Sequence, residues 1–318
     1  MSEFSIKDIA LTGFRFAREH PAAILIWAVV SLISVVLYQW IIVSMAGEAT
    51  TQLMAMQEAM QTDPQSADPT AVFPLMGQMY SAMFVGLIPM LIASAILSAA
   101  ATRGILQPQA GGPGFLRFGA DEFRMIIVLI VVGIIIGVVG LAGSVLASIL
   151  GVVVGVAASG GEPPAPGALT GPMTAIIGSI MIVVGLICLF IYGRFSLAAP
   201  LTLDRRSINI FSSVAMTKGK GGRIFRTLLL AAVLYLVVSL LGLAIFAGVA
   251  AAALGDVAAV GDFLGRPDMS SLSAFFTPLR IGYLVLMSVI SALGAAIMLT
   301  PPAAIYRVLT AEGVDEVF

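Results

Sequence analysis

Residues 227–253 read TLLLAAVLYLVVSLLGLAIFAGVAAAA, an uncharged and mostly apolar run that directly follows Arg223 and Arg226. A helix needs roughly 20 such residues to cross about 30 Å of hydrocarbon, so this run is long enough to span a bilayer. Five further runs of this kind lie at 21–46, 79–102, 125–150, 173–197 and 279–304. The sequence therefore predicts an all-α polytopic membrane protein, a single integral membrane domain (1–318) with six transmembrane helices.

The composition excludes a soluble globular domain. Hydrophobic residues make up 59% of the chain and charged residues only 10%, and the mean hydropathy is +1.07. Charged residues approach a quarter of an ordinary soluble domain. The first run is also longer than the roughly 7–15 apolar residues of a signal peptide, which favours an uncleaved anchor. Cys188 is the single cysteine, which excludes an intrachain disulfide and favours a small buried apolar role.

Lysine and arginine fall almost entirely on one side of the six runs. Of 16 such residues, only Arg266 and Arg280 belong to the segments on the other side. Cytoplasmic loops carry an excess of Lys and Arg, so both termini are predicted to be cytoplasmic. An even number of spans requires the two termini to share a side. We therefore expect a multi-pass protein of the bacterial inner membrane.

A faint internal repeat groups the runs in pairs. Each odd-numbered run follows a segment that mixes aromatic residues, glycine and arginine, and each even-numbered run ends near small residues and an arginine. The pattern predicts three hairpin units at about 1–110, 111–203 and 204–318. The alternative is that inner helix ends simply collect arginine and aromatic residues.

Amphipathic helices are expected beside the spans. In 4–19 the apolar side is formed by Phe4, Ile6, Ile9, Leu11, Phe14 and Ala17. In 204–218 it is formed by Ile208, Phe211 and Ala215, and Gly219 then supplies a left-handed cap. Helices of this kind lie flat at the headgroup level of a membrane. The segment 48–61 also has an amphipathic pattern and precedes a break at Asp63-Pro64.

The third segment on the basic side of the runs, 194–226, is called the third inner loop here. It contains a sequence pattern that resembles a known group. The pattern consists of Ala198-Ala-Pro-Leu-Thr-Leu-Asp204, then Ser213-Val-Ala-Met-Thr-Lys-Gly219, then Arg223-Ile-Phe-Arg226. It resembles the multi-span membrane domain that is sometimes fused to bacterial glycerophosphodiester phosphodiesterases, and related stand-alone six-span proteins. Here Met216 replaces the usual leucine, and Val214 stands where the group often has an aromatic residue.

That resemblance implies a scaffold or accessory role in the membrane. Nothing matches the catalytic phosphodiesterase domain, because His20 is the only histidine and no carboxylate cluster surrounds it. The residues that carry the likeness are Ser213, Thr217, Lys218 and Gly219.

Side chains for catalysis are scarce. The cores of the spans contain no Asp, Glu, Lys or Arg, and no Ser/His/Asp or Cys/His arrangement can be built around His20 without a second histidine or a carboxylate cluster near it. We therefore expect a non-enzymatic protein without a cofactor or metal, with a scaffold, assembly or lipid-interacting role. The alternative is a transporter or channel for an uncharged or lipid-like solute.

Basic residues concentrate in the third inner loop, which contains only one acid, Asp204. Each Lys or Arg near an anionic leaflet contributes about 1 kcal/mol of attraction. The loop is therefore a candidate contact for lipid headgroups or for a membrane-protein partner, and nothing indicates nucleic acid. The candidate residues are Arg205, Arg206, Lys218, Lys220, Arg223 and Arg226. The alternative is that this charge only sets topology.

Small residues spaced four apart predict close helix packing within the chain. The pairs Gly133/Gly137 and Gly151/Gly155 bracket the third span, and Ala244, Gly248 and Ala252 mark the fifth. Their spacing does not distinguish this packing from self-association.

Overall fold

The computed structural model describes residues 5–62, 69–109, 112–158 and 171–315, and every regular element in these ranges is helical. Six helices are long and apolar enough to cross a membrane, which confirms the predicted class. They are α3 (Pro21–Thr62), α4 (Pro69–Leu106), α5 (Ala120–Ala158), α6 (Gly171–Phe195), α9 (Gly221–Leu254) and α12 (Pro278–Asp315).

The long helices pack as three consecutive hairpins, α3 with α4, α5 with α6, and α9 with α12. Short elements precede each hairpin: α1 (Ile6–Ala10) and α2 (Thr12–Glu19), the 3₁₀ turn η1 (Pro113–Phe115), and α7 (Ala198–Arg205) with α8 (Ile210–Met216). Within the described residues, the third hairpin carries further helices between its arms, α10 (Val257–Gly265) and α11 (Leu272–Phe275). The threefold sequence repeat therefore stays a prediction.

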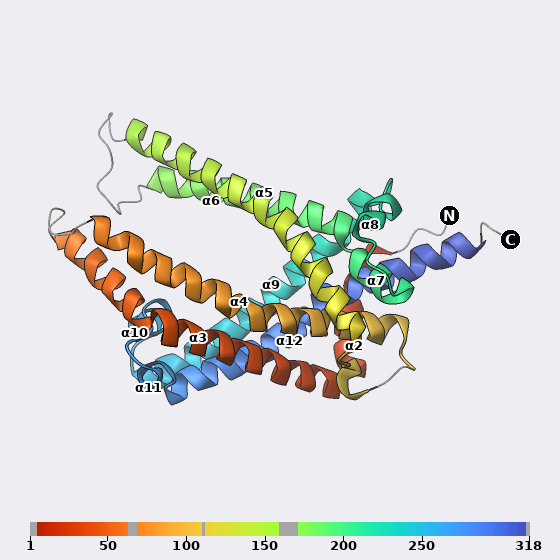
Figure 1. The fold of residues 1–318 in the computed structure, drawn as a ribbon, viewed down its shortest axis with the longest axis horizontal. Helices are drawn as coiled ribbons and strands as arrows, with labels where there is room; N and C mark the ends of the chain where they lie inside the picture. Colours follow the sequence, from red (N-terminus) through yellow and green to blue (C-terminus); the bar gives the residue numbers. More distant parts are fainter. Residues whose placement is uncertain (1–4, 63–68, 110–111, 159–170, 316–318) are drawn as a thin grey trace.

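The two ends of the bundle differ in the elements they carry. Helices α2, α7 and α8 lie at the end where both termini of the chain emerge, and α10 and α11 lie at the other end (Figure 1). We call these the inner end and the outer end. The six basic residues proposed as headgroup contacts lie at the end of α7, in the turn after α8 and in the first turns of α9, and so belong to this inner end.

Helix α3 is longer than its predicted span. It contains 42 residues, which at about 1.5 Å each gives a length of roughly 63 Å, about twice the hydrocarbon thickness. The amphipathic segment 48–61 continues the same helix rather than forming a separate one, because no proline occurs between Pro21 and Pro64. Pro21 begins the helix, at a position where the missing N–H of proline costs no hydrogen bond.

The main core lies towards the inner end, where α12 contacts α2, α3 and α4. Trp27 is fully buried there, stacks on Phe16 with ring centroids 5.3 Å apart, and donates from Nε1 to the Gly114 carbonyl at 2.8 Å. Gly13 lets α2 approach closely, since an added Cβ would overlap the backbone of Ile297 in α12. This contact fixes α2 against the bundle.

The predicted amphipathic helix 4–19 is divided at Leu11 into α1 and α2. Its buried side includes Ile9, Ala10 and Phe16, whereas Leu11 and Phe14 are exposed. Phe4 lies outside the described residues. The segment thus turns one face into the protein and keeps a short apolar strip outside.

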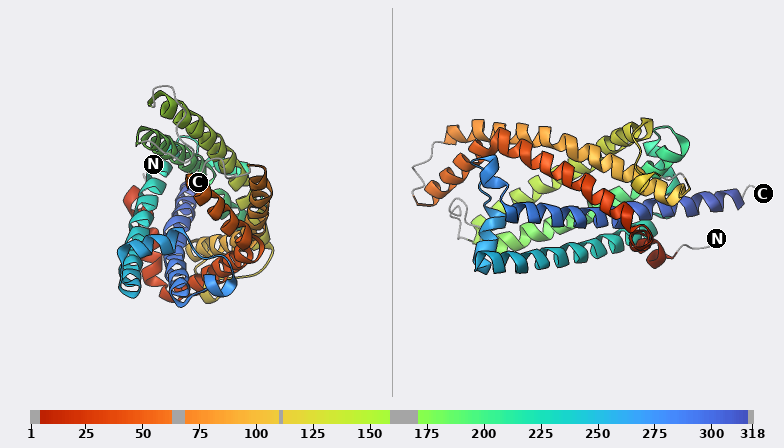
Figure 2. Two further views of the ribbon diagram at one scale, coloured as in Figure 1. Left: turned by 90° about the vertical axis from the view of Figure 1, so that its left-hand side faces the viewer. Right: turned by 90° about the horizontal axis from the view of Figure 1, so that it is seen from below.

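The small-residue stripes are exposed at several positions where packing was predicted. An added Cβ at Gly133, Gly137 or Gly248 would meet no described atom within 4 Å. Gly151 does pack closely, since its Cβ would stand 2.6 Å from Ile177 of α6. The prediction of packing within the chain is therefore wrong for the first three. For Gly133 and Gly137 the reason is that the α5–α6 hairpin diverges from the other long helices (Figure 2).

Candidate functional site

The motif of the third inner loop folds around Arg194, near the end of α6. The Arg194 guanidinium donates to the carbonyl oxygens of Thr217 at 2.7 Å and Val214 at 2.9 Å. In return, Ser213 Oγ donates to the Arg194 carbonyl at 2.9 Å. Ser213 and Thr217 are fully buried, and their spacing of four places both on one face of α8. These two residues therefore join α6 to α8 and do not face a ligand.

Gly219 has the left-handed conformation that was predicted, with φ 78°. The preceding helix is shorter than expected, because Arg206 also has a positive φ, 50°, and ends α7 at Arg205. The predicted helix 204–218 is therefore wrong in its extent: α8 covers only Ile210–Met216. The chain turns at both ends of α8.

The six basic residues fall into two groups, one on each side of α8. Arg205 and Arg206 end α7, and the other four occupy the turn after α8 and the first turns of α9. At about 1.5 Å per residue, α8 separates the groups by roughly 10 Å. We call the two groups together the basic inner surface: Arg205, Arg206, Lys218, Lys220, Arg223 and Arg226. Of these, Lys220 and Arg223 are half-buried and the others are exposed.

Asp204, the acid of the same loop, is engaged by a distant residue. Tyr306 of α12 donates from its hydroxyl to an Asp204 carboxylate oxygen at 2.7 Å. This hydrogen bond links the end of α7 to α12. The acid that accompanies the basic inner surface therefore has a structural partner of its own.

Apolar side chains adjoin the basic inner surface. Phe211 is 71% exposed and lies edge-on to Phe195, with ring centroids 6.2 Å apart. Ile208 is exposed as well. The predicted apolar side of 204–218 thus faces outward, beside lysine and arginine. Such a combination is typical of a surface at the membrane interface.

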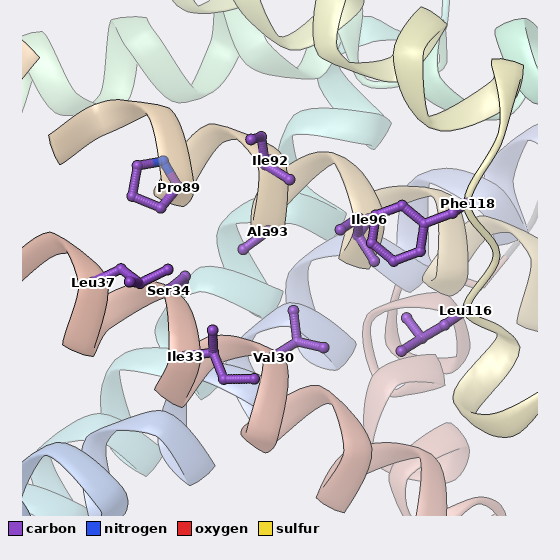
Figure 3. A pocket seen from close by; sticks show the side chains of 10 residues that line it. All are labelled: Val30, Ile33, Ser34, Leu37, Pro89, Ile92, Ala93, Ile96, Leu116 and Phe118. Atoms are coloured by element: carbon purple, nitrogen blue, oxygen red, sulfur yellow. The ribbon is translucent and has the colours of Figure 1, made fainter. Parts of the chain in front are cut away.

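An apolar groove of about 340 Å³ lies between α3 and α4 (Figure 3). Ser34 is the one polar residue in its lining: Val30, Ile33, Ser34, Leu37, Pro89, Ile92, Ala93, Ile96, Leu116 and Phe118. The exposed side chains of Ile33, Leu37 and Ile92 show that the groove opens to the outside of the bundle. Phe118 stands at one end of the groove, and Arg117 precedes it in the chain.

Sequence reasoning missed a buried charge cluster at the inner end. Arg103 is 2% exposed and Glu122 is 5% exposed, and the Arg103 guanidinium donates to the Glu122 carboxylate. Arg103 also donates to the Phe115 carbonyl at 3.3 Å and lies 3.7 Å from Asp121. An available signal was the pair of acids in the first turn of α5, which the helix dipole favours.

Arg280 occupies an aromatic cage at the outer end. Its guanidinium lies 4.1 Å from the ring centroid of Phe263 and 5.2 Å from that of Phe275, and it donates to the Phe263 carbonyl. Only 6% of Arg280 is exposed. This arginine thus fastens α10 and α11 to the start of α12.

Comparison of the chain with known protein families, with curated proteins and with solved structures gave no match. The likeness to the membrane domain of the phosphodiesterases therefore stays a prediction.

Metal-binding side chains do not gather in the described part of the chain, where no group of three or more His, Cys, Asp or Glu residues could hold an ion. Cys188 is half-buried in α6, with its Sγ 4.0 Å from the Ile136 carbonyl oxygen of α5. It packs between the two arms of a hairpin. The arrangement therefore leaves the groove and the basic inner surface as the candidate sites.

Proposed function

We propose that this chain is a non-enzymatic membrane protein with a scaffold or assembly role that binds phospholipid. The observation that carries the proposal is the apolar groove between α3 and α4. It opens sideways and is lined almost wholly by hydrocarbon, and its lining residue Phe118 directly follows the cation Arg117 in the chain. An acyl chain suits this lining, and a phosphate group suits the adjacent cation.

The nature of the lining favours lipid over a polar solute. A ligand with several hydrogen-bonding groups would lose its water without gaining partners in the groove, since Ser34 alone offers a polar side chain. An acyl chain loses nothing by the same transfer. A lipid bound here would have its tail along α3 and α4 and its headgroup towards the inner end.

The basic inner surface supports a preference for anionic lipid. Each exposed cation near an anionic leaflet adds about 1 kcal/mol of attraction, and apolar Phe211 and Ile208 adjoin these cations. The same charge favours an orientation with the inner end in the cytoplasm of a bacterial cell.

The role of the motif also favours a scaffold. Ser213 and Thr217 are buried in the junction between α6 and α8, where Ser213 donates a hydrogen bond to the Arg194 carbonyl. These two residues of the motif that resembles the phosphodiesterase membrane domain therefore act in folding. A shared structural joint would account for the resemblance without any shared catalysis.

Lipid that co-purifies with the protein tests the proposal directly. The chain would be extracted in native lipid patches and its bound lipids identified by mass spectrometry. Ile33→Trp and Ile92→Trp should fill the groove and reduce bound phospholipid severalfold, whereas Leu236→Trp, on the exposed face of α9, should not. Equal lipid content in all three variants would contradict the assignment of the groove.

The preference for anionic lipid needs a second set of variants. Neutralising Arg205, Arg206, Lys218 and Lys220 with glutamine should lower the share of anionic lipid while the orientation is kept. An unchanged lipid profile would remove the headgroup role and leave topology as the function of this charge.

The orientation can be checked with fusions. Green fluorescent protein attached after α12 should fluoresce, and alkaline phosphatase attached after Thr62 should be active. The reverse pattern would contradict a cytoplasmic inner end.

A further inference from the structure

A second cavity, of about 320 Å³, lies at the inner end between α2, the end of α4 and α12. In contrast to the groove, it is lined by polar and charged side chains from distant parts of the chain. Those that matter here are Thr12, Arg15, Glu19 and His20 of the N-terminal segment and Arg307 of α12. The fold thus brings the only histidine together with two arginines.

The two arginines donate to neutral oxygens. The Arg15 guanidinium donates to the Asp8 carbonyl, and that of Arg307 to the Ile105 carbonyl at 3.3 Å. Within the described residues, no ion pair joins either one to a carboxylate, whereas Arg103 and Arg124 both have one. Their positive charge is therefore not neutralised by direct contact with an acid of the described chain.

His20 is held in place by aromatic rings. Its ring centroid lies 4.9 Å from that of Phe16 and 5.2 Å from that of Phe115, nearly edge-on to the latter. Pro21, the next residue, begins α3 and fixes the backbone there. The imidazole thus has little freedom, and one ring nitrogen of a neutral histidine is a donor.

We propose that this cavity binds a phosphate monoester group. Guanidinium groups bind phosphate through paired, charge-assisted hydrogen bonds, and two arginines with an imidazole supply donors from several directions. The phosphate belongs either to a soluble ligand or to a lipid headgroup of the inner leaflet. Because the cavity is separate from the groove, either proposal can fail while the other stands.

Substitution of Glu19 is expected to strengthen phosphate binding, whereas substitution of the arginines is expected to weaken it. Glu19 lines the same cavity, one helical turn after Arg15, and its carboxylate repels a bound anion. Glu19→Gln should therefore tighten phosphate binding severalfold. A residue that only stabilised the fold would not show this gain.

The test uses the full chain in nanodiscs of phosphatidylcholine, with inorganic phosphate titrated by calorimetry. Wild-type protein should bind saturably. Arg15→Gln and Arg307→Gln should each weaken binding roughly tenfold, which is the loss expected for charge-assisted hydrogen bonds. Arg18→Gln is the matched control, because Arg18 is an exposed arginine of the same helix that does not line the cavity.

A second arm distinguishes a soluble ligand from a lipid. Nanodiscs doped with phosphatidic acid, which has a monoester headgroup, would be compared by native mass spectrometry with discs doped with phosphatidylglycerol. If the protein retains phosphatidic acid selectively and Arg15→Gln abolishes this retention, the phosphate belongs to a lipid headgroup. If the protein binds only inorganic phosphate, and does so saturably, the phosphate belongs to a soluble ligand. If wild-type protein binds neither, or if Arg18→Gln loses as much as Arg15→Gln, the phosphate site is overturned.

Discussion

The Arg194 guanidinium donates to the Thr217 carbonyl at 2.7 Å, although 23 positions separate the two residues. The bond satisfies a carbonyl at the C-terminal end of α8, where a helix has unpaired acceptors and where its dipole favours a cation. The Ser213 hydroxyl in turn donates to the Arg194 carbonyl, so α6 and α8 are joined by hydrogen bonds in both directions.

We expect Arg194→Gln to destabilise this junction. Loss of two charge-assisted hydrogen bonds should lower the free energy of unfolding by about 3 kcal/mol. Denaturant unfolding in detergent micelles measures the change. Arg226→Gln removes an exposed cation from the same loop and should cost less than about 0.5 kcal/mol. Similar losses in both variants would contradict a specific role for Arg194.

The Arg103–Glu122 pair should show strong coupling. Arg103→Met leaves the Glu122 carboxylate buried without its partner, which should cost roughly 3–5 kcal/mol of unfolding free energy. The double variant Arg103→Met/Glu122→Gln should recover most of that loss, because the isolated charge is gone. A double-mutant cycle provides the measurement, and additive effects would argue against the pair.

Arg124→Gln is the control for that cycle. Arg124 pairs with Asp121 at 2.8 Å, but both side chains are about a third exposed. Pairs of this kind contribute about 1 kcal/mol or less. A large loss of unfolding free energy in Arg124→Gln would show that the stability of the inner end depends on its charges in general and not on the buried pair.

The aromatic cage predicts a difference between two outer arginines. Arg280→Lys should lower the stability of the outer end by about 1–2 kcal/mol, because lysine lacks the planar group that faces Phe263. Arg266→Lys, at an exposed site, should be neutral. Limited proteolysis between α10 and α11 provides the readout, and equal cleavage of both variants would contradict the cage.

Gly13 should tolerate no side chain. An added methyl group would stand 2.6 Å from the Ala296 carbonyl oxygen and overlap the Ile297 backbone, neither of which can rotate away. Gly13→Ala should therefore displace α2 and lower the melting temperature by several degrees. Gly222→Ala meets no described atom within 4 Å and should leave the melting temperature unchanged or raise it. If both variants melted alike, close packing of α2 on α12 would be in doubt.

Long apolar runs were easy to predict, because length and hydropathy are local properties. The left-handed Gly219 was also predicted from local chemistry. The extent of α8 was not, since it depends on Arg206 adopting a positive φ that the sequence does not signal.

Gly133 and Gly137 show a different limit of prediction from sequence. Spacing placed these residues on one face of a helix, but it could not say what that face meets. Close approaches occur instead at other glycines, Gly13 and Gly151 among them, because a neighbouring helix or side chain lies against them.

By itself the sequence determined the six apolar helices and the concentration of basic charge at one end, since both follow from composition counted along the chain. Tertiary structure decided which of those charges are structural. Arg103, Arg194 and Arg280 are held by an acid, by helix carbonyls and by aromatic rings. Arg15 and Arg307 share a polar cavity with His20. The physical reason is that the environment of a charge depends on contacts between residues far apart in the chain, which only packing creates.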